Sequence, residues 1–268
     1  MNVPIGDRLL AFWFRRGWRG FQPLFRLHSR FAGRAALRVR TRYGSVFDLP
    51  PHDYIPAHVL REGYYESEVF EALRLRLGSG AVLWDIGGNF GLHAVTAKLL
   101  FPSATVVAFE PNPAMAALIA HHARLNRAEV AVAPLALGAV SGSRQLHVVT
   151  AGNPGMTTLH PWVEARYDTV IPVECARGDA LVAAGRYPSP TVIKLDVEGG
   201  EADVLLGLGT LLAAPALRAI VFEGGGGLAD RPLDDPVAGP LLRAGFRLRP
   251  LSRREHTAHA LENYAAER

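Results

Sequence analysis

The sequence predicts an α/β fold with a doubly wound, mostly parallel sheet. Short apolar runs bounded by glycine or proline alternate with helical patterns through most of the chain. Continuous apolar runs are typical of strands buried on both faces, and the helices between them supply the crossovers of a parallel sheet. Two of these runs end in a glycine-rich or acidic turn that leads directly into a helix, as at the ligand-binding edge of such sheets.

The expected elements follow in chain order. Strands are expected at 81–86, 105–109, 130–135, 191–195 and 219–222, with helices at 93–100, 113–126 and 201–212. The mixed stretch 139–190 contains one strand-like segment at 145–149, and further strands are expected at 246–251 and 258–264. Right-handed crossovers would place helices on both faces of the sheet.

The first 63 residues have a different character. Residues 1–42 contain ten arginines and one acid, Asp7, a net charge of +9; the total of +4 leaves −5 for the rest. Apolar residues recur every three or four positions from 10 to 25, which predicts an amphipathic helix that Pro23 breaks or restarts. Segments 36–42 and 45–49 flank Tyr43-Gly44 and predict a β-hairpin. We therefore expect an arm and hairpin over 1–63 and an α/β domain over 64–268, beginning with a helix at 64–77.

Three roles are open for the basic aromatic segment 7–31. It can pack on the domain or on a second subunit, which leaves an oligomer open. It can lie on an anionic membrane surface, with arginines at the head groups. It can also bind nucleic acid through phosphates and stacked bases, which the regular apolar face disfavours.

Composition limits the remaining classes. The longest strongly apolar stretch near the N-terminus, 9–14, has six residues, whereas a spanning helix needs about 20. No secretory signal pattern is present, and the single cysteine, Cys175, permits no intrachain disulfide. These features predict a cytoplasmic protein, with contact at the inner membrane face if the arm binds lipid.

The first chemical motif follows the strand at 81–86. Asp85 ends the strand, and glycines stand two and six residues later, at Gly87 and Gly91. Gly88 lies between them, but Asn89 occupies a position where the dinucleotide fingerprint requires glycine. Such a loop can cradle a compact amino-acid moiety at a helix N-terminus and need not bind a pyrophosphate.

The second motif, Glu110-Pro111-Asn112, ends the next strand, 23 residues after Gly87. A carboxylate at this place can accept hydrogen bonds from both hydroxyls of an adenosine ribose. We therefore expect Glu110 to bind a nucleoside.

The third motif places Lys194, Asp196 and Glu198 in and after an apolar strand. Charged groups there are costly unless they are paired. We number the strands predicted at 81–86, 105–109, 130–135, 191–195 and 219–222 from 1 to 5. In a sheet with the order 3-2-1-4-5, the strand at 191–195 lies between those that end at Asp85 and Glu223. Carboxylates of the strand ends would then ring one edge, with Lys194 neutralising part of them. A purely structural ion pair of Lys194 is the alternative.

These three motifs resemble the FkbM family of S-adenosylmethionine-dependent methyltransferases, whose pattern is D-x-G-A-N-x-G, E-P-x-P and I-K-x-D-V-E-G-x-E. The resemblance extends over about 64–264 and includes Tyr65-Glu66 and 136–138. Gly88 replaces the usual alanine, only Asp179 remains of a T-x-L-D pattern, and 224–227 is unusually rich in glycine.

The resemblance implies a seven-stranded, Rossmann-like class I methyltransferase sheet and O-methyl transfer to a sugar, glycan or secondary metabolite. It implies that S-adenosylmethionine is held by Glu66, Asp85, Gly87, Gly88, Asn89, Gly91, Glu110, Pro111, Asn112, Ala136 and Leu137. Asp196 and Glu198 are the first candidates for the general base, oriented by Lys194, ahead of His93 and His160.

Two alternatives concern the chemistry. The clustered carboxylates suit a divalent cation such as Mg²⁺, although no spacing enforces a metal site and none is expected. An NAD-dependent oxidoreductase would share the fold, but the glycine spacing and the segment 194–201 do not fit it.

Overall fold

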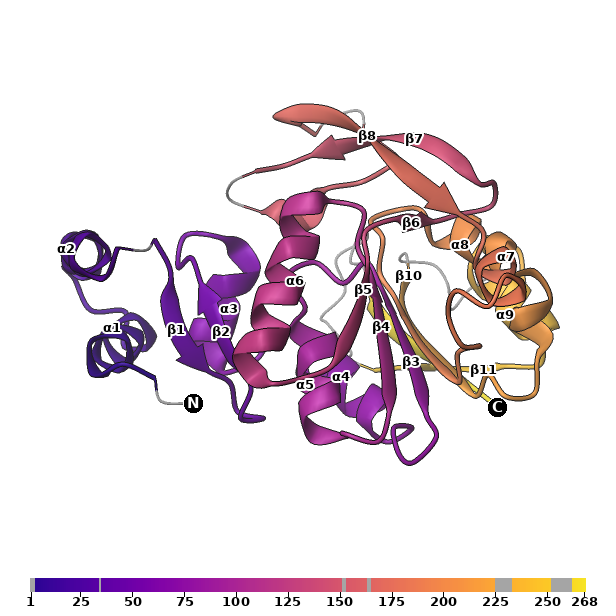
Figure 1. The fold of residues 1–268 in the computed structure, drawn as a ribbon, viewed down its shortest axis with the longest axis horizontal. Helices are drawn as coiled ribbons and strands as arrows, with labels where there is room; N and C mark the ends of the chain where they lie inside the picture. The colour runs from indigo at the N-terminus through magenta and orange to yellow at the C-terminus, as the bar shows by residue number, and fades with distance from the viewer. Residues whose placement is uncertain (1–2, 34, 151–152, 163–164, 225–232, 252–261) are drawn as a thin grey trace.

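The computed structural model describes residues 3–33, 35–150, 153–162, 165–224, 233–251 and 262–268. Its centre is a seven-stranded sheet in the order β11-β12-β10-β9-β3-β4-β5 (Figure 1). The strands are β3 (Val82–Ile86), β4 (Thr105–Phe109), β5 (Val130–Ala133), β9 (Val192–Leu195), β10 (Ala219–Gly224), β11 (Arg247–Pro250) and β12 (Glu262–Glu267). β12 runs antiparallel to both neighbours, and the pairs from β10 to β5 are parallel. The predicted doubly wound sheet is thereby confirmed.

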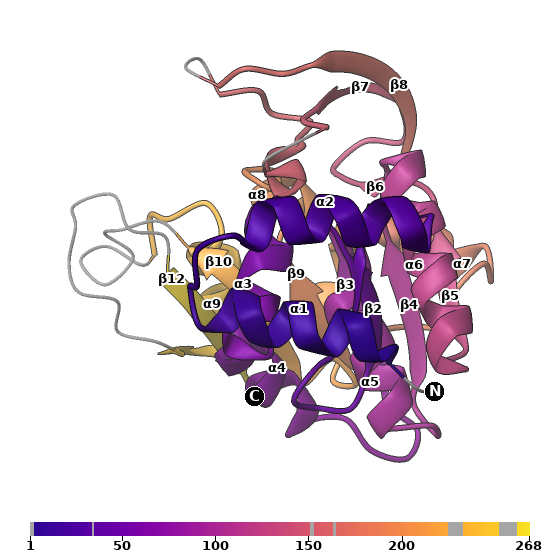
Figure 2. The ribbon, with the colours of Figure 1, turned by 90° about the vertical axis from the view of Figure 1, so that its left-hand side faces the viewer.

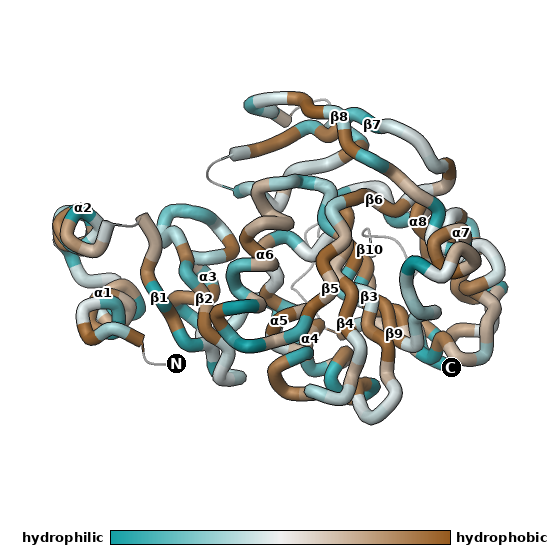
Figure 3. The backbone as a smooth tube through the Cα atoms, in the orientation of Figure 1, coloured by the Kyte–Doolittle hydropathy of each residue, from teal (hydrophilic) through white to brown (hydrophobic). Residues whose placement is uncertain are grey.

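Helices cover both faces of the sheet, as right-handed crossovers require. One layer contains α4 (Ser67–Arg74), α5 (Leu92–Leu100) and α6 (Pro113–Asn126), and the other contains α7 (Gly178–Ala183), α8 (Glu201–Leu208) and α9 (Ala238–Arg243). Side chains that alternate along each strand separate into two apolar clusters, so that Val106 faces the first layer and Val107 the second. Figure 3 shows the resulting hydrophobic colouring of the central strands.

A small second sheet lies beyond one edge of the large one. It has the order β6-β8-β7 and consists of β6 (Ala136–Leu137), β7 (Gly142–Val148) and β8 (Thr169–Ala176). The sequence predicted part of β7 but not β8, whose Pro172 argues against a central strand. Pro172 is tolerated because β6 pairs only with Cys175 and Ala176, which leaves β8 with β7 as its partner at the proline.

The N-terminal arm forms two helices, α1 (Ile5–Arg15) and α2 (Phe21–Ala32). The predicted interruption of the helix is present, but it lies before Pro23: the chain turns between the helices, where Gly17 and Gly20 have positive φ, and α2 restarts two residues before the proline. Pro23 lies in the first turn of α2, where a missing N–H leaves no helical hydrogen bond unmade. The predicted hairpin is present as β1 (Leu37–Arg40) and β2 (Val46–Leu49).

Other boundaries differ from the prediction. Helix α3 (Tyr54–Glu62) was not expected, the helix at 64–77 is reduced to α4, and that at 201–212 ends at Leu208 and continues as a 3₁₀ turn. Of the strand expected at 258–264, the part at 258–261 lies outside the described residues, as do 225–227 of the glycine-rich segment. No helix of the described ranges is long and apolar enough to cross a membrane.

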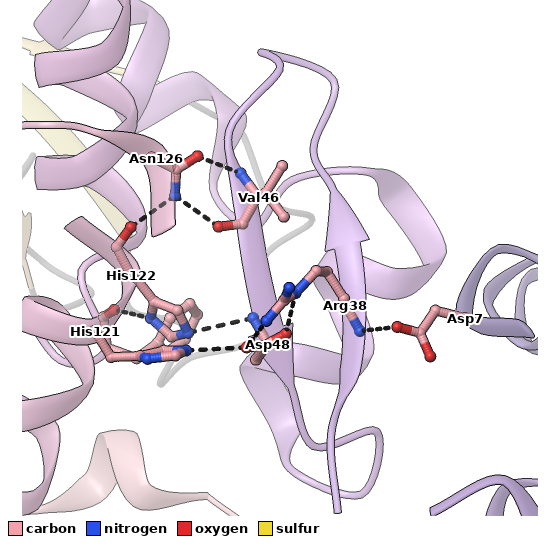
Figure 4. A network of polar contacts seen from close by, with 8 residues as sticks. Asp7, Arg38, Val46, Asp48, His121, His122 and Asn126 are labelled. Carbon is pink, nitrogen blue, oxygen red and sulfur yellow. Dashed lines mark hydrogen bonds and ion pairs between the residues drawn. The ribbon is translucent and has the colours of Figure 1, made fainter. Parts of the chain in front are cut away.

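The hairpin is joined to α6 by the polar network of Figure 4. Arg38 makes two hydrogen bonds of 2.8 Å to the Asp48 carboxylate, whose Oδ2 also lies 2.9 Å from His121 Nε2. The Asn126 amide satisfies both backbone groups of Val46, at 2.7 Å each. The edge of β2 is therefore covered by side chains of α6.

His122 extends this network to the glycine loop. Its Nδ1 lies 2.8 Å from the carbonyl oxygen of Phe90, and its Nε2 accepts a 3.3 Å hydrogen bond from the backbone N–H of Asp48. Burial lowers the pKa of His122, which matches a neutral ring that donates from Nδ1 and accepts at Nε2. The hairpin thus supports the loop that follows β3.

Candidate functional site

A cavity of about 340 Å³ opens at the carboxyl ends of β3, β4, β9 and β10, with the small sheet as its second wall. Parallel sheets bind ligands at this edge, where the order of strands reverses. The structure brings nine of the predicted site residues into the wall: Glu66, Gly87, Asn89, Glu110, Pro111, Ala136, Leu137, Asp196 and Glu198.

The other predicted residues lie behind this wall. Asp85, Gly88, Gly91, Asn112 and Lys194 are close to lining residues in sequence or space, but none of them lines the cavity. Through their contacts these residues can hold the lining residues in position.

The glycine loop approaches the end of β9 too closely for any side chain. Gly87 has φ +78°, and a Cβ atom placed on it would lie 1.8 Å from the carbonyl oxygen of Asp196. Gly91, at φ +89°, begins α5 with its N-terminus directed at the loop. Glycine at 87 therefore lets β3 and β9 remain neighbours up to the cavity wall.

Glu110 ends β4 with both carboxylate oxygens held by backbone donors. Oε2 accepts a 2.8 Å hydrogen bond from the N–H of Asn89, and Oε1 accepts one of 2.9 Å from the N–H of Asn112. The Asn112 side chain in turn caps α6 by accepting from Ala114 N–H at 3.0 Å. Burial nevertheless raises the pKa of Glu110 to about 7. The carboxylate faces the cavity in a fixed orientation.

Asp85 is enclosed below the cavity. Its Oδ2 accepts a 3.0 Å hydrogen bond from Ala94 N–H in the first turn of α5, and Oδ1 lies 3.7 Å from the Lys194 ammonium. Burial raises the pKa of Asp85, against the effect of Lys194. In this arrangement Asp85 joins β3, α5 and β9.

Lys194 is the cation that the sequence placed inside β9. Its Nζ donates to the carbonyl oxygen of Gly87 at 2.9 Å and lies 2.9 Å from Asp196 Oδ2. Burial alone would lower the pKa of Lys194, but Asp196 and Asp85 outweigh this effect and keep it above its ordinary value. A charged lysine therefore pairs with Asp196, which fits both the predicted neutralisation of the acidic edge and the alternative of a structural ion pair.

Three glutamates share the cavity wall with Asp196. Burial, followed by the charge of Asp196, raises the pKa of Glu66 to about 7 and those of Glu198 and Glu223 to about 8. Within the described ranges, no group of three or more His, Cys, Asp or Glu side chains is arranged to hold a metal ion.

The backbone is also strained at this site. Four non-glycine residues of the described chain have positive φ, and three of them, Glu66, Asn89 and Glu198, line the cavity. Such conformations cost free energy and persist where the surrounding structure enforces them, which is common at functional sites. Three of these strained positions therefore carry polar side chains that line the same cavity.

The raised pKa values predict that the protein loses stability as the pH rises from about 5 to about 8. The folded state holds the proton of Glu223 up to about pH 8, whereas an unfolded glutamate loses it near pH 4.5. Between these values the folded state binds more protons, so the free energy of unfolding falls with rising pH. Glu223→Gln should remove this dependence at one site and stabilise the protein by about 2–4 kcal/mol at pH 8 but by less than about 1 kcal/mol at pH 5.

Chemical denaturation at both pH values measures this effect. The control is Glu129→Gln, which replaces an exposed glutamate and should change neither value. An equal gain at pH 5 and pH 8 would contradict the pKa assignment.

Sequence reasoning did not single out the lining residues Arg144 and Asp203, and it ranked the two histidines His93 and His160 below the carboxylates. His160 and Asp203 both line the cavity, with Nε2 and Oδ2 3.5 Å apart, and Arg144 lines it from β7. Arg144 and Asp203 lie outside the three motifs, so only folding reveals them. His93, considered as a base, is instead buried beside Tyr64, and burial lowers its pKa to about 3.

Comparison with known proteins identifies the family. Residues 85–248, more than half of the chain, match the model of the methyltransferase FkbM domain. The hexuronic acid methyltransferase AglP of Haloferax volcanii is 32% identical over 143 residues, which cover 53% of this chain and 56% of that protein. Methyltransferase 1 of Beauveria bassiana is 28% identical over 141 residues, 46% of this chain and 57% of its own. The chain thus matches little more than half the length of these curated relatives.

Solved structures show similar chain paths at low identity. A methyltransferase FkbM from Methylobacillus flagellatus aligns with a TM-score of 0.47 and 14% identity over 94% of this chain and 72% of its own. Trm5b from Pyrococcus abyssi aligns with a TM-score of 0.48 and 12% identity over 87% of this chain and 55% of its own.

The family match contains the glycine loop, Glu110 and the whole segment from Lys194 to Glu201, the three motifs that meet at the cavity. It favours the methyltransferase over the oxidoreductase, which the glycine spacing had already disfavoured. The chain belongs to the FkbM methyltransferase family.

Proposed function

We propose that this chain transfers a methyl group from S-adenosylmethionine to a hydroxyl group of a sugar. The observation that carries the proposal is Glu110, whose carboxylate is fixed by two backbone N–H groups at the cavity wall beside Gly87. Each carboxylate oxygen keeps accepting capacity beyond its backbone partner, so the pair can receive the two ribose hydroxyls.

The rest of the wall fits the remaining parts of the same ligand. Pro111, Ala136 and Leu137 form an apolar section beside Glu110 that suits the flat adenine ring. Gly87 also brings bare backbone to the cavity, and Glu66 supplies a carboxylate for the amino-acid end. In our proposal Asp85, Gly88, Gly91 and Asn112 support this binding from behind the wall.

S-adenosylmethionine supplies an electrophilic methyl group on a positively charged sulfur. The wall carries Asp196 together with three glutamates, Glu66, Glu198 and Glu223, whose raised pKa values of about 7 to 8 leave them partly ionised near neutral pH. This negative charge favours a cationic ligand. The protein must then align the acceptor oxygen with the methyl group and remove its proton.

Asp196 and Glu198 are the proposed catalytic residues for this step. The lysine ammonium 2.9 Å from Asp196 keeps that carboxylate in place, and we assign Lys194 a positioning role. Glu198, with a pKa raised to about 8 by burial and by Asp196, can hold the proton that leaves the acceptor hydroxyl.

The acceptor side of the cavity suits a carbohydrate. Thr157, Thr158 and His160 line it with hydrogen-bonding groups. Arg144 also lines the cavity, and its guanidinium donates to the carbonyl oxygens of Ser143 and Val140. Since the relative AglP is named for a hexuronic acid, we propose a uronic acid residue whose carboxylate pairs with Arg144.

Isothermal titration with S-adenosylmethionine, S-adenosylhomocysteine and NAD tests the cofactor. We expect the first two to bind. Glu110→Gln should weaken the binding of both about 100-fold, because the glutamine NH₂ group would face a backbone N–H donor and the two ribose hydroxyls would lose their charged acceptor. The control Glu129→Gln should bind as tightly as the unchanged protein. Binding of NAD alone would overturn the proposal.

The acceptor is tested separately with purified protein, isotopically labelled S-adenosylmethionine and uronic acid glycosides, with the neutral glycosides as controls. We expect an O-methyl product with a mass increase of one methyl group from the acidic sugar alone. Cofactor binding with methylation of the neutral sugar only would reject the uronic acid and retain the methyltransferase.

A further inference from the structure

We infer that the helix pair α1–α2 docks this protein on an anionic lipid surface. The inference concerns a part of the molecule away from the cavity and goes beyond the proposed methyl transfer. In Figure 1 the two helices lie at one end of the molecule, opposite α9 and β11, and Figure 2 shows them side by side as its outermost layer.

Helix α1 is apolar on two sides. Leu10 and Ala11 are buried against the domain. A second stripe, formed by Ile5, Leu9 and Phe12, recurs every three or four residues and remains 74%, 63% and 47% exposed. A helix on the surface of a globular protein usually has one apolar face, which is buried. A second, exposed apolar stripe indicates a site of interaction.

Helix α2 repeats the arrangement. Phe21 and Phe25 are buried, whereas Leu24, Leu27 and Phe31 form an outer stripe with exposures of 40%, 54% and 83%. Two neighbouring helices therefore turn apolar stripes outward, which is the geometry of helices that lie in a membrane interface.

The charges around these stripes have one sign. The arginines at 8, 15, 16, 19, 26 and 30 are all exposed. Asp7, the only acid of the first 42 residues, is fully buried and accepts a 3.0 Å hydrogen bond from the Arg38 N–H. The guanidinium of Arg16 lies 5.2 Å from the Phe12 ring centre, so cation and apolar stripe are adjacent.

An anionic bilayer matches both properties at once. Its head groups attract the arginines, and its acyl boundary accepts the aliphatic side chains of Ile5, Leu9 and Leu27. Single-stranded nucleic acid would use the arginines and aromatic rings but has no counterpart for these aliphatic groups. In a dimer formed through this face, the arginines of one copy would lie against those of the other, and their like charges would repel.

The test is co-sedimentation of the full chain with vesicles of phosphatidylcholine, with or without about one third phosphatidylglycerol. We expect binding to the anionic vesicles, weakened by salt, and none to the neutral ones. The triple variant Arg8→Glu, Arg16→Glu and Arg30→Glu should lower the partition coefficient about 100-fold or more, and Leu9→Ser with Phe31→Ser should lower it at least about tenfold.

The matched control reverses three exposed arginines elsewhere, Arg124→Glu, Arg218→Glu and Arg247→Glu. It has the same net charge as the arm triple and should keep vesicle binding. Equal losses in the two triples, or no binding to anionic vesicles, would overturn the inference. If vesicles are not bound, binding of single-stranded RNA through the arm would assign the surface to nucleic acid. A dimer that Phe31→Ser abolishes would then assign it to a second copy of the chain. S-adenosylmethionine titrations of the arm variants should match the unchanged protein, so this inference and the proposed function fail separately.

Discussion

Gly87→Ala should destabilise the protein by about 3–5 kcal/mol and abolish ligand binding at the cavity, because one added methyl group meets backbone rather than a movable side chain. The new Cβ would lie 1.8 Å from the Asp196 carbonyl oxygen at a φ of +78°. To accommodate it, β3 and β9 must separate. That movement would strain the 3.1 Å hydrogen bond from Asp196 N–H to Ile86 and the 2.9 Å bond from Lys194 to Gly87.

Urea unfolding followed by circular dichroism measures this loss, and the adjacent Gly88→Ala is the matched control. Its Cβ would lie 3.1 Å from the Ile119 Cδ1 atom, the movable end of a side chain, and alanine is usual here in the family pattern. We expect a change below about 1 kcal/mol for the control. Similar losses in the two variants would mean that the loop tolerates no added volume anywhere, and that the close approach at Gly87 has no special role.

Lys194→Met should also destabilise the protein by about 3–5 kcal/mol, since it removes the cation from a buried group of carboxylates. Lys194 is 4% exposed and Asp85 is 1% exposed, so water cannot replace the lost partner. Asp85 would then have to bind a proton or remain as a buried charge. The carbonyl oxygen of Gly87 would lose its 2.9 Å donor as well.

Two further variants test whether the loss of stability comes from the uncompensated charge of Asp85. Lys98→Met changes the other lysine of the chain, which donates to two backbone carbonyls near the surface, and should cost about 1–2 kcal/mol. Adding Asp85→Asn to Lys194→Met should recover part of the stability, because the uncompensated charge disappears. Full stability of Lys194→Met alone would show that Asp85 is uncharged in the native protein.

Where local rules apply, the sequence indicated at which edge of the sheet the site residues lie. Asp85 and Glu110 each follow a continuous apolar run, and Asp196 follows one that only Lys194 interrupts. The strands of one parallel sheet end at the same edge. The glycine pattern after Asp85 and the proline after Asn112 fix the turns into α5 and α6 by local backbone preference. Helix α6 was therefore predicted with its observed bounds.

The same rules failed where packing decides. Strand β8 was not predicted because it contains Pro172. Its pairing with β6 and β7 becomes visible only in the folded protein. The turn between α1 and α2 lies at Gly17 and Gly20, a few residues before Pro23, and Phe21 and Phe25 of α2 are buried in the core.

By itself, the sequence determined the parallel α/β sheet, the acidic edge at its carboxyl ends and the basic arm, because periodicity and turn residues act over a few positions. Tertiary structure alone decided which polar groups face the cavity and which are enclosed behind it. Asp85 lies next to the last residue of β3 and Glu110 directly follows the neighbouring β4, yet one carboxylate points at α5 and Lys194 and the other lines the cavity. Burial, hydrogen-bond partners and charge depend on residues far away in the chain, so their consequences, the raised pKa values and the outward stripes of α1 and α2, appear only when the chain has folded.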